Sequence, residues 1–365
     1  MCKTSYTPDS VKAQAAEILS NWGMSADNVA LTAEGMLDCD LRGIDTHGIS
    51  LLALYDKWRV SGGFALDATD KLLRDGPSYA SIDAQGGLGF PVSVRAVELA
   101  CKKARETGLA AVTVKNSRHF GAAGYYARLG AEQGMMLLVA TSTKVVCMVP
   151  PGAADAVLGT NPLAYAMPRQ NGAPVVFDMA TSTAAGNKIR LYQLSGTPVP
   201  EGWVVDHEGK SVTDPDIASE IVYGSRPGGL TPLGATPGMG AYKGYGLALM
   251  GHFLGGTLAG GDFAGSKNRP ADAADNIGHF FLAMDPAKFR DLAAFEADMC
   301  DVDESLRATP AVDPDRPILL PGDVERKVAD QRRTEGIPMA DALVDQLKRI
   351  STEAGAKFVL TPQPE

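Results

Sequence analysis

The chain has 365 residues, of which 45% are hydrophobic and 21% charged, and its formal net charge is −9. This length exceeds what one simple hydrophobic core serves, so two domains or subdomains are expected. No basic block suits a nucleic-acid surface, and no apolar run approaches the roughly 20 residues that span a membrane.

The cysteines and the first residues bear on the cellular compartment. Five cysteines are scattered along the chain without a CxxC pair, which disfavours a disulfide framework and a structural zinc site. Residues 1–14 lack the charged segment and apolar run of a signal peptide. We therefore expect a cytoplasmic protein.

The first 70 residues are predicted to be helical. Thr7 and Pro8 suit the N-cap and first position of a helix that ends at Gly23. Residues 25–43 and 45–63 are predicted to form a second and a third helix, the third capped by Asp45.

Short apolar, β-rich segments separated by Gly, Pro and Asn begin near residue 73. Strand-like segments are 79–87, 110–117, 135–144, 156–168, 174–182, 202–209 and 277–286; helices are expected over 91–108, 245–261, 293–308 and 339–355. We therefore predict a helical domain from residues 1–72 plus 286–365, beside a sheet domain of residues 73–285.

The common nucleotide-binding and hydrolase motifs are missing. The glycine-rich stretches Gly86–Pro91 and Gly234–Gly240 do not follow a strand and open a helix as GxGxxG must. No GKS, GKT or GxSxG occurs either. This pattern disfavours a Rossmann fold, a P-loop and a serine hydrolase.

Two of the five histidines lie in suggestive surroundings. His47 belongs to an Asp-Thr-His-Gly stretch, and His119 follows a strand-like run and is surrounded by small residues that let a ligand approach the backbone. A lone histidine is more often structural than catalytic. The structural interpretation is favoured for His207, His252 and His279.

Several other segments allow both a functional and an ordinary interpretation. Asp178, at a strand end before Met179, Ala180, Thr181 and Ser182, suits a ribose and phosphates, or equally a helix cap. Lys243, between two glycines before a helix, suits a phosphate or solvent. The turn at Gly322 and Asp323 does not by itself distinguish a functional role from an ordinary turn.

A metal site is the main alternative from another class. Asp45, His47 and His119 could together serve a metal-dependent lyase or hydrolase. No HxH or HExxH spacing supports such a site. No metal is therefore assigned.

Seven motifs together resemble one family. They are "DLRGIDTHGIS", "VKNSRHFGAAGYYA", "LGTNPLAYAMP", "VVFDMATS", "TDP", "KGYGLAL" and "LPGD". Their order is similar to that of the malate/L-lactate dehydrogenase family of non-Rossmann type, which includes ureidoglycolate, sulfolactate, diketogulonate and cyclic-imine carboxylate oxidoreductases. The resemblance runs from about residue 10 to 335.

This resemblance implies an α/β (α+β) fold: a central mixed sheet domain that binds its cofactor without a Rossmann motif, beside a helical domain from both chain ends. It also implies an oxidoreductase that uses NAD or NADP and transfers hydride at C2 of a small 2-hydroxy or 2-oxo acid, or of a cyclic imino acid. Members are typically homodimers with the active site near the subunit interface. No nucleic-acid or membrane partner is expected.

The resemblance also suggests site residues. His47 and His119 match histidines with acid/base roles in different members, so either is the proton donor, with Thr46 donating a hydrogen bond where serine is commoner. Residues expected to line the cofactor are Lys144, Asp178, Met179, Ala180, Thr181, Ser182, Lys243, Gly322 and Asp323.

One position departs from the family pattern. Leu51 stands four residues after His47, where the family often has an arginine able to hold a substrate carboxylate. Either another cation does so, with Arg42 and Arg118 as candidates, or the substrate is unusual.

Overall fold

The computed structural model describes residues 3–169, 172–266, 268 and 274–364. Within them a seven-stranded sheet has the order β2-β3-β4-β10-β5-β6-β7. Its strands are β2 Lys71–Asp75, β3 Tyr79–Asp83, β4 Leu109–Ser117, β5 Met136–Thr141, β6 Leu163–Met167, β7 Val175–Met179 and β10 Ile277–Met284. β3 and β4 are parallel and the other neighbours antiparallel. The prediction of an α/β fold with a central mixed sheet is confirmed.

One face of the sheet is covered by two helices, α4 (Gly89–Thr107) and α5 (Ala123–Glu132). α4 forms the crossover between parallel strands β3 and β4, a connection that needs a long segment. Buried side chains of both helices share one apolar core with the strands. β10 lies inside the sheet between β4 and β5, which explains why most of its residues are buried.

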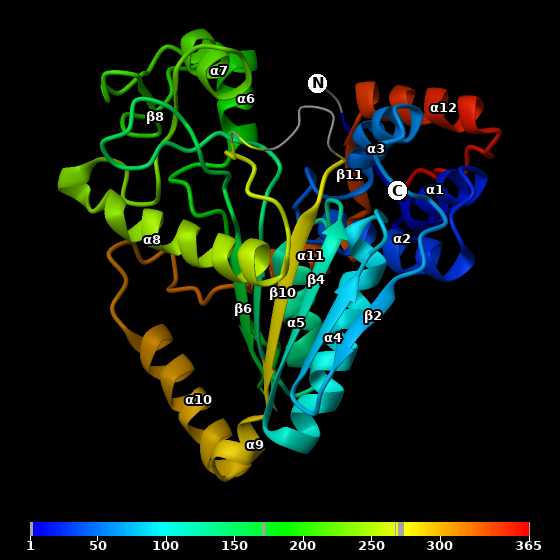
Figure 1. Cartoon of the computed structure of the whole chain (residues 1–365), viewed down its shortest axis with the longest axis vertical. Coiled ribbons are helices and arrows are strands. Elements are labelled where there is room, and N and C mark those ends of the chain that lie inside the picture. The colour runs from blue at the N-terminus through cyan, green and yellow to red at the C-terminus, as the bar shows by residue number, and fades with distance from the viewer. Residues whose placement is uncertain (1–2, 170–171, 267, 269–273, 365) are drawn as a thin grey trace.

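Both ends of the chain contribute to a second core. The N-terminal helices are α1 Pro8–Asn21, α2 Ala26–Leu41 and α3 Leu52–Val60, and the C-terminal ones are α11 Asp323–Glu335 and α12 Asp341–Ala354. β1 (Lys3–Tyr6) pairs with β11 (Ile337–Ala340). Their apolar side chains form one buried cluster. Figure 1 shows α1, α2, α3 and α12 side by side at one edge of the sheet.

The third predicted helix begins later than expected. Residues 45–48 form a turn, a 3₁₀ segment spans Ile49–Leu51, and α3 begins at Leu52. Asp45 is not the N-cap, because its carboxylate pairs with Arg332 of α11. The prediction for residues 45–51 was wrong because a long-range ion pair replaced the local cap.

The remaining elements lie on the other side of the sheet. A small unit with its own core comprises α6 (Gly186–Ser195), β8 (Val204–Asp206), α7 (Pro215–Tyr223) and β9 (Gly228–Leu230). A short 3₁₀ turn, Pro237–Met239, precedes α8 (Ala241–His252). A π-helical segment, Phe253–Leu258, continues α8 and packs on β10 and β5.

α9 (Pro286–Phe289) and α10 (Leu292–Ala308) lie at the end of the sheet opposite α1 and α12. α10 contributes no buried residue to any core. The division into a helical domain of residues 1–72 plus 286–365 and a sheet domain of residues 73–285 stays a prediction. Of the C-terminal elements, α11, β11 and α12 pack with the N-terminal helices. No helix in the described part of the chain is both long and apolar enough to cross a bilayer.

Candidate active site

The structure brings two histidines from distant segments together. His47 lies in the turn after α2, and His119 directly follows β4. Their ring centres are 5.5 Å apart, and both side chains are half-buried. The hydroxyl of Thr46 lies 2.8 Å from Nδ1 of His47. Burial lowers the pKa of His47, so its ring is mostly neutral near pH 7.

A buried acid holds the turn that carries His47. The carboxyl of Asp40, at the end of α2, accepts a hydrogen bond from the backbone N–H of Ile49 at 2.8 Å. A Cβ at position 48 would overlap this carboxyl, so the turn requires Gly48. Burial raises the pKa of Asp40 to about 8, which keeps the carboxyl protonated at neutral pH.

Arg332 ties the same turn to α11. Its guanidinium donates to the carboxylate of Asp45 and to the backbone carbonyl of Asp40. Asp45 therefore already has a cationic partner, and it is not directed to a metal with His47 and His119. Among the described residues no group of three or more His, Cys, Asp or Glu is arranged to hold a metal. The metal-dependent lyase or hydrolase is not supported.

His119 is held more tightly than His47. Its Nδ1 lies 2.8 Å from the hydroxyl of Tyr55 in α3 and 3.3 Å from the backbone N of Gly121. Burial, together with the nearby rings of His47 and His279, lowers the pKa of His119 to about 3. His119 therefore stays neutral over the physiological range.

Lys144 lies near the aromatic rings that neighbour His119. The ring of Tyr55 stacks on Trp58 with centres 5.5 Å apart, and Nζ of Lys144 lies 5.6 Å from the Trp58 ring centre. Nζ also pairs with Asp275 at 2.6 Å. Lys144 thus contacts the surroundings of His119 through two aromatic rings.

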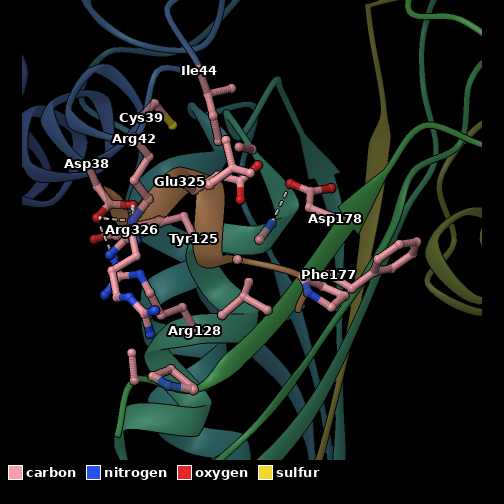
Figure 2. Close-up of a pocket in the computed structure, with 18 of the residues that line it drawn as sticks. Asp38, Cys39, Arg42, Ile44, Tyr125, Arg128, Phe177, Asp178, Glu325 and Arg326 are labelled. Carbon is pink, nitrogen blue, oxygen red and sulfur yellow. Dashed lines mark hydrogen bonds and ion pairs between the residues drawn. The ribbon is translucent and has the colours of Figure 1, made fainter. Parts of the chain in front are cut away.

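A cavity of about 620 Å³ is lined by residues of α2, α5, β7 and the turn before α11. Figure 2 shows Asp178 and Phe177 of β7 on one side and Arg42, Arg128 and Arg326 on the other. Ile44 and Ala122, each three residues from one of the two histidines, also line it. This volume is within the ~300–1,000 Å³ typical of cofactor sites.

Asp178 faces this cavity. Its Oδ2 accepts a hydrogen bond from the backbone N–H of Gly124 in the first turn of α5, at 2.7 Å. The side chain is solvent-exposed although protein atoms surround it. Loss of solvation and the nearby charge of Glu325 raise the pKa of Asp178 to about 6, despite the bond from Gly124.

The two hydroxyl side chains that follow Asp178, those of Thr181 and Ser182, are bound to backbone carbonyls. Thr181 donates to the carbonyl of Thr160 at 2.7 Å, and Ser182 donates to that of Ala184 at 2.8 Å. Both are buried, whereas Met179 and Ala180 are half-buried outside the cavity lining. The structure therefore gives Thr181 and Ser182 a role in fixing the chain after β7.

Lys243 does not line the cavity either. It lies exposed in the first turn of α8, with Nζ 5.9 Å from the ring centre of Tyr242. Leu233 links this turn to the segment after β7, because its N–H donates to Thr181 at 2.9 Å and its carbonyl accepts from Gly244 at 3.1 Å. Lys243 and the Asp178–Ser182 segment are therefore connected through one loop.

Gly322 and Asp323 have different roles. Gly322 lines the cavity with φ +93°, and a Cβ there would come within 3.2 Å of the backbone N of Val176. Asp323 is buried and pairs with Arg307 at 2.8 Å and Arg326 at 2.9 Å. Burial raises its pKa, but a backbone hydrogen bond and these arginines outweigh burial, so the pKa is below its usual value.

The two candidate cations for a substrate carboxylate already have partners. Arg118 is buried and donates to the carbonyls of Gly63 at 2.6 Å and Ser117 at 3.1 Å. Arg42 pairs with Asp38 at 3.0 Å while lining the cavity. Leu51 is buried in the helical core.

Sequence reasoning did not find Asp40, Tyr55, Phe177, Arg128 and Arg326. Asp40 alone gave a signal, since an acid among the apolar residues that end α2 is unusual. The others needed the fold, because residues far apart in sequence give them their partners.

The fold and the site define an α/β enzyme with paired imidazoles and a cofactor-sized cavity. The family model described as malate/L-lactate dehydrogenase matches residues 6–348. A malate dehydrogenase of Pyrococcus abyssi is 34% identical over 93% of this chain and 92% of its own. The (2R)-3-sulfolactate dehydrogenase (NADP(+)) of Chromohalobacter salexigens is 35% identical over 87% and 89%.

A solved structure agrees with these matches. The malate dehydrogenase of Entamoeba histolytica superimposes with a TM-score of 0.91 at 26% identity, covering 98% of this chain and 99% of its own. The chain therefore belongs to the malate/L-lactate dehydrogenase family, and it is an oxidoreductase.

Proposed function

We propose that the protein is an NAD(P)-dependent dehydrogenase of a small 2-hydroxy acid, with His47 and His119 at the reacting carbon. The observation that carries the proposal is the pair of histidine rings 5.5 Å apart. A cofactor-sized cavity supports it, because its lining includes Ile44 and Ala122 from the two segments that carry these histidines. The relatives are named malate and sulfolactate dehydrogenases, and one name includes NADP. Both named substrates are 2-hydroxy acids.

The cavity suits a dinucleotide in three respects. Its volume of about 620 Å³ is adequate for such a ligand. A side chain at Gly322 would press on Val176, so only backbone faces a ligand there. The carboxylate of Asp178 can accept hydrogen bonds from a ribose. Lys144, Lys243 and the Met179–Ser182 segment remain proposed cofactor contacts outside this cavity.

A bound reduced nicotinamide supplies a hydride, and the protein must then manage charge and protons. Hydride addition at C2 moves the carbonyl electron pair onto oxygen, which takes a proton from an imidazolium. In the oxidative direction a neutral imidazole accepts the hydroxyl proton instead. Burial lowers the pKa of both rings, which favours the neutral form and hence the base role near pH 7.

The test is turnover with a panel of substrates and two variants. Purified protein is mixed with NADH or NADPH and pyruvate, oxaloacetate, 3-sulfopyruvate or a cyclic imino acid, and loss of reduced cofactor is followed by absorbance. We expect His47→Asn or His119→Asn to lower kcat by about 10²–10⁴-fold with cofactor Kd little changed. His207→Asn, an exposed histidine, is the matched control. Near-normal kcat in both variants would refute the proposal.

We also propose a homodimer in the cytoplasm. α10 has no buried residue and carries Leu292, Val302 and Leu306, which are 42–52% exposed. Exposed apolar faces of this kind are typical of protein interfaces, and family members typically pair. Buried free thiols at Cys39, Cys101 and Cys147 suit a reducing compartment. Light scattering at micromolar concentration tests the dimer, and a monomer mass would contradict it.

A further inference from the structure

The ring of His119 has both of its described hydrogen bonds on one nitrogen. Nδ1 faces the hydroxyl of Tyr55 at 2.8 Å and the backbone N–H of Gly121 at 3.3 Å. Nε2 has no partner in the described ranges and is not a fully buried atom. One ring nitrogen is therefore held by the protein, and the other remains available to a ligand.

The backbone bond decides which nitrogen carries the proton. A backbone N–H can only donate, so Nδ1 of His119 must present its lone pair to Gly121. In a neutral imidazole the proton is then on Nε2. The hydroxyl of Tyr55, directed at the same lone pair, must also donate.

Local structure makes this arrangement rigid. Gly121 has φ +78°, and a Cβ there would overlap the ring of Phe90. This position therefore requires glycine, and the tight packing on Phe90 holds its N–H in place. Tyr55 is fully buried, and its ring stacks on Trp58 and packs near Phe64. Burial raises the pKa of Tyr55 well above its usual value, so the donor proton is retained.

The other groups around His119 do not favour a second proton on its ring. His47 faces it from the turn after α2, and His279 faces it from β10. His279 is itself neutral and bound on both nitrogens, by Thr141 at 2.7 Å and Ser117 at 2.9 Å. A proton on Nδ1 of His119 would have to displace two donors. His119 therefore has one accessible state.

From this geometry we propose that Tyr55 and the backbone of Gly121 fix His119 as the Nε2-protonated tautomer. His119 then donates a hydrogen bond to the C2 oxygen of the substrate, and His47 is the residue that gains and loses the proton. This division of roles rests on the proposed dehydrogenase function. Tyr55 is a positioning residue, since it acts through His119.

The tautomer can be tested without turnover. Protein with ¹⁵N-labelled histidine is studied by NMR near pH 7, and His119→Asn assigns the His119 signals. We expect a protonated, pyrrole-type shift for Nε2 and a pyridine-type shift for Nδ1. A proton on Nδ1 overturns the proposal whether or not the protein oxidises 2-hydroxy acids.

Tyr55→Phe tests the positioning residue, because it keeps the stacked ring and removes the hydroxyl. We expect a measurable Nδ1-protonated population and a kcat lower by about 2–10-fold, the effect of one hydrogen bond. Cofactor KM should be unchanged. Ser10→Ala, which also loses a buried hydroxyl bond, to the carbonyl of Thr7 in the first turn of α1, controls for stability alone and should leave the His119 spectrum unaltered.

The outcomes separate this inference from the proposed function. Turnover with an Nδ1-protonated His119 overturns the inference and keeps the function. An Nε2-protonated His119 in a protein that reduces no 2-oxo acid or cyclic imino acid supports the tautomer and refutes the function, including the role division. If Tyr55→Phe changes neither spectrum nor kcat, Tyr55 has no positioning role. The wild-type spectrum decides the tautomer even if that variant does not fold.

Discussion

The buried carboxyl of Asp40 gives the sharpest test of how the His47 turn is held. Asp40 is 3% exposed, accepts from Ile49, and fits against Gly48. Asp40→Asn keeps the shape and an acceptor oxygen, but it cannot ionise. The variant therefore removes the titration of this group and little else.

The size of the effect follows from linkage. Burial raises the pKa of Asp40 from 3.8 to about 8. Between these values the unfolded chain loses the proton while the folded chain keeps it. The stability that the bound proton contributes is complete below pH ~4 and is lost as pH rises through about 8. The slope is ~1.4 kcal/mol per pH unit, or ~2.7 kcal/mol from pH 5 to pH 7.

Urea unfolding of wild-type and Asp40→Asn protein at pH 5, 6 and 7 measures this difference. All other titrating groups are common to both proteins, so they cancel. We expect the wild type to lose ~2.7 kcal/mol relative to the variant between pH 5 and pH 7. Parallel pH dependence would show that Asp40 ionises normally in the folded protein. Asp40→Leu should cost a further ~1–3 kcal/mol, because it leaves the N–H of Ile49 unpaired.

Three further predictions concern the site. Leu51→Arg buries an unpaired cation in the helical core, so it should lower the free energy of unfolding in urea by ~3 kcal/mol or more. Leu51→Met should lower it by ~1.5 kcal/mol or less. Equal losses in the two variants would contradict the burial of Leu51. Gly322→Ala and Gly134→Ala should each lose ~1–2 kcal/mol of stability, because both glycines have a positive φ. Only Gly322→Ala should raise cofactor Kd in a fluorescence titration, because Gly322 lines the cavity and its Cβ would come within 3.2 Å of the backbone N of Val176. Because the pKa of His47 is lowered, the rate of 2-hydroxy acid oxidation should be constant above pH 6.5 and should fall only at lower pH. A rate that still rises with pH above pH 7 would argue against His47 as the base.

Much of the fold could be predicted because its signals are local. The first helix begins with Pro8 after Thr7, whose side chain accepts from Ser10 at 3.4 Å as an N-cap should. The apolar spacing of residues 91–108 predicted a helix, and α4 spans Gly89–Thr107. Periodicity and caps act over a few residues, so the sequence carries them directly.

The candidate site was predictable only as a set of motifs. The sequence by itself identified the histidines, Asp178 and the turn at Gly322, but only tertiary structure brought His47 within 5.5 Å of His119. It also joined the hydroxyl of Thr181 to the backbone carbonyl of Thr160.

The sequence determined which helices and strands form, which residues carry ionisable or small side chains, and hence the family. Tertiary structure alone decided that Asp45 pairs with Arg332, that Asp40 is buried and protonated, and that Tyr55 binds His119. The reason is physical: a side chain's partner and its desolvation depend on segments far away in the chain, whereas helix and strand propensity depend on near neighbours.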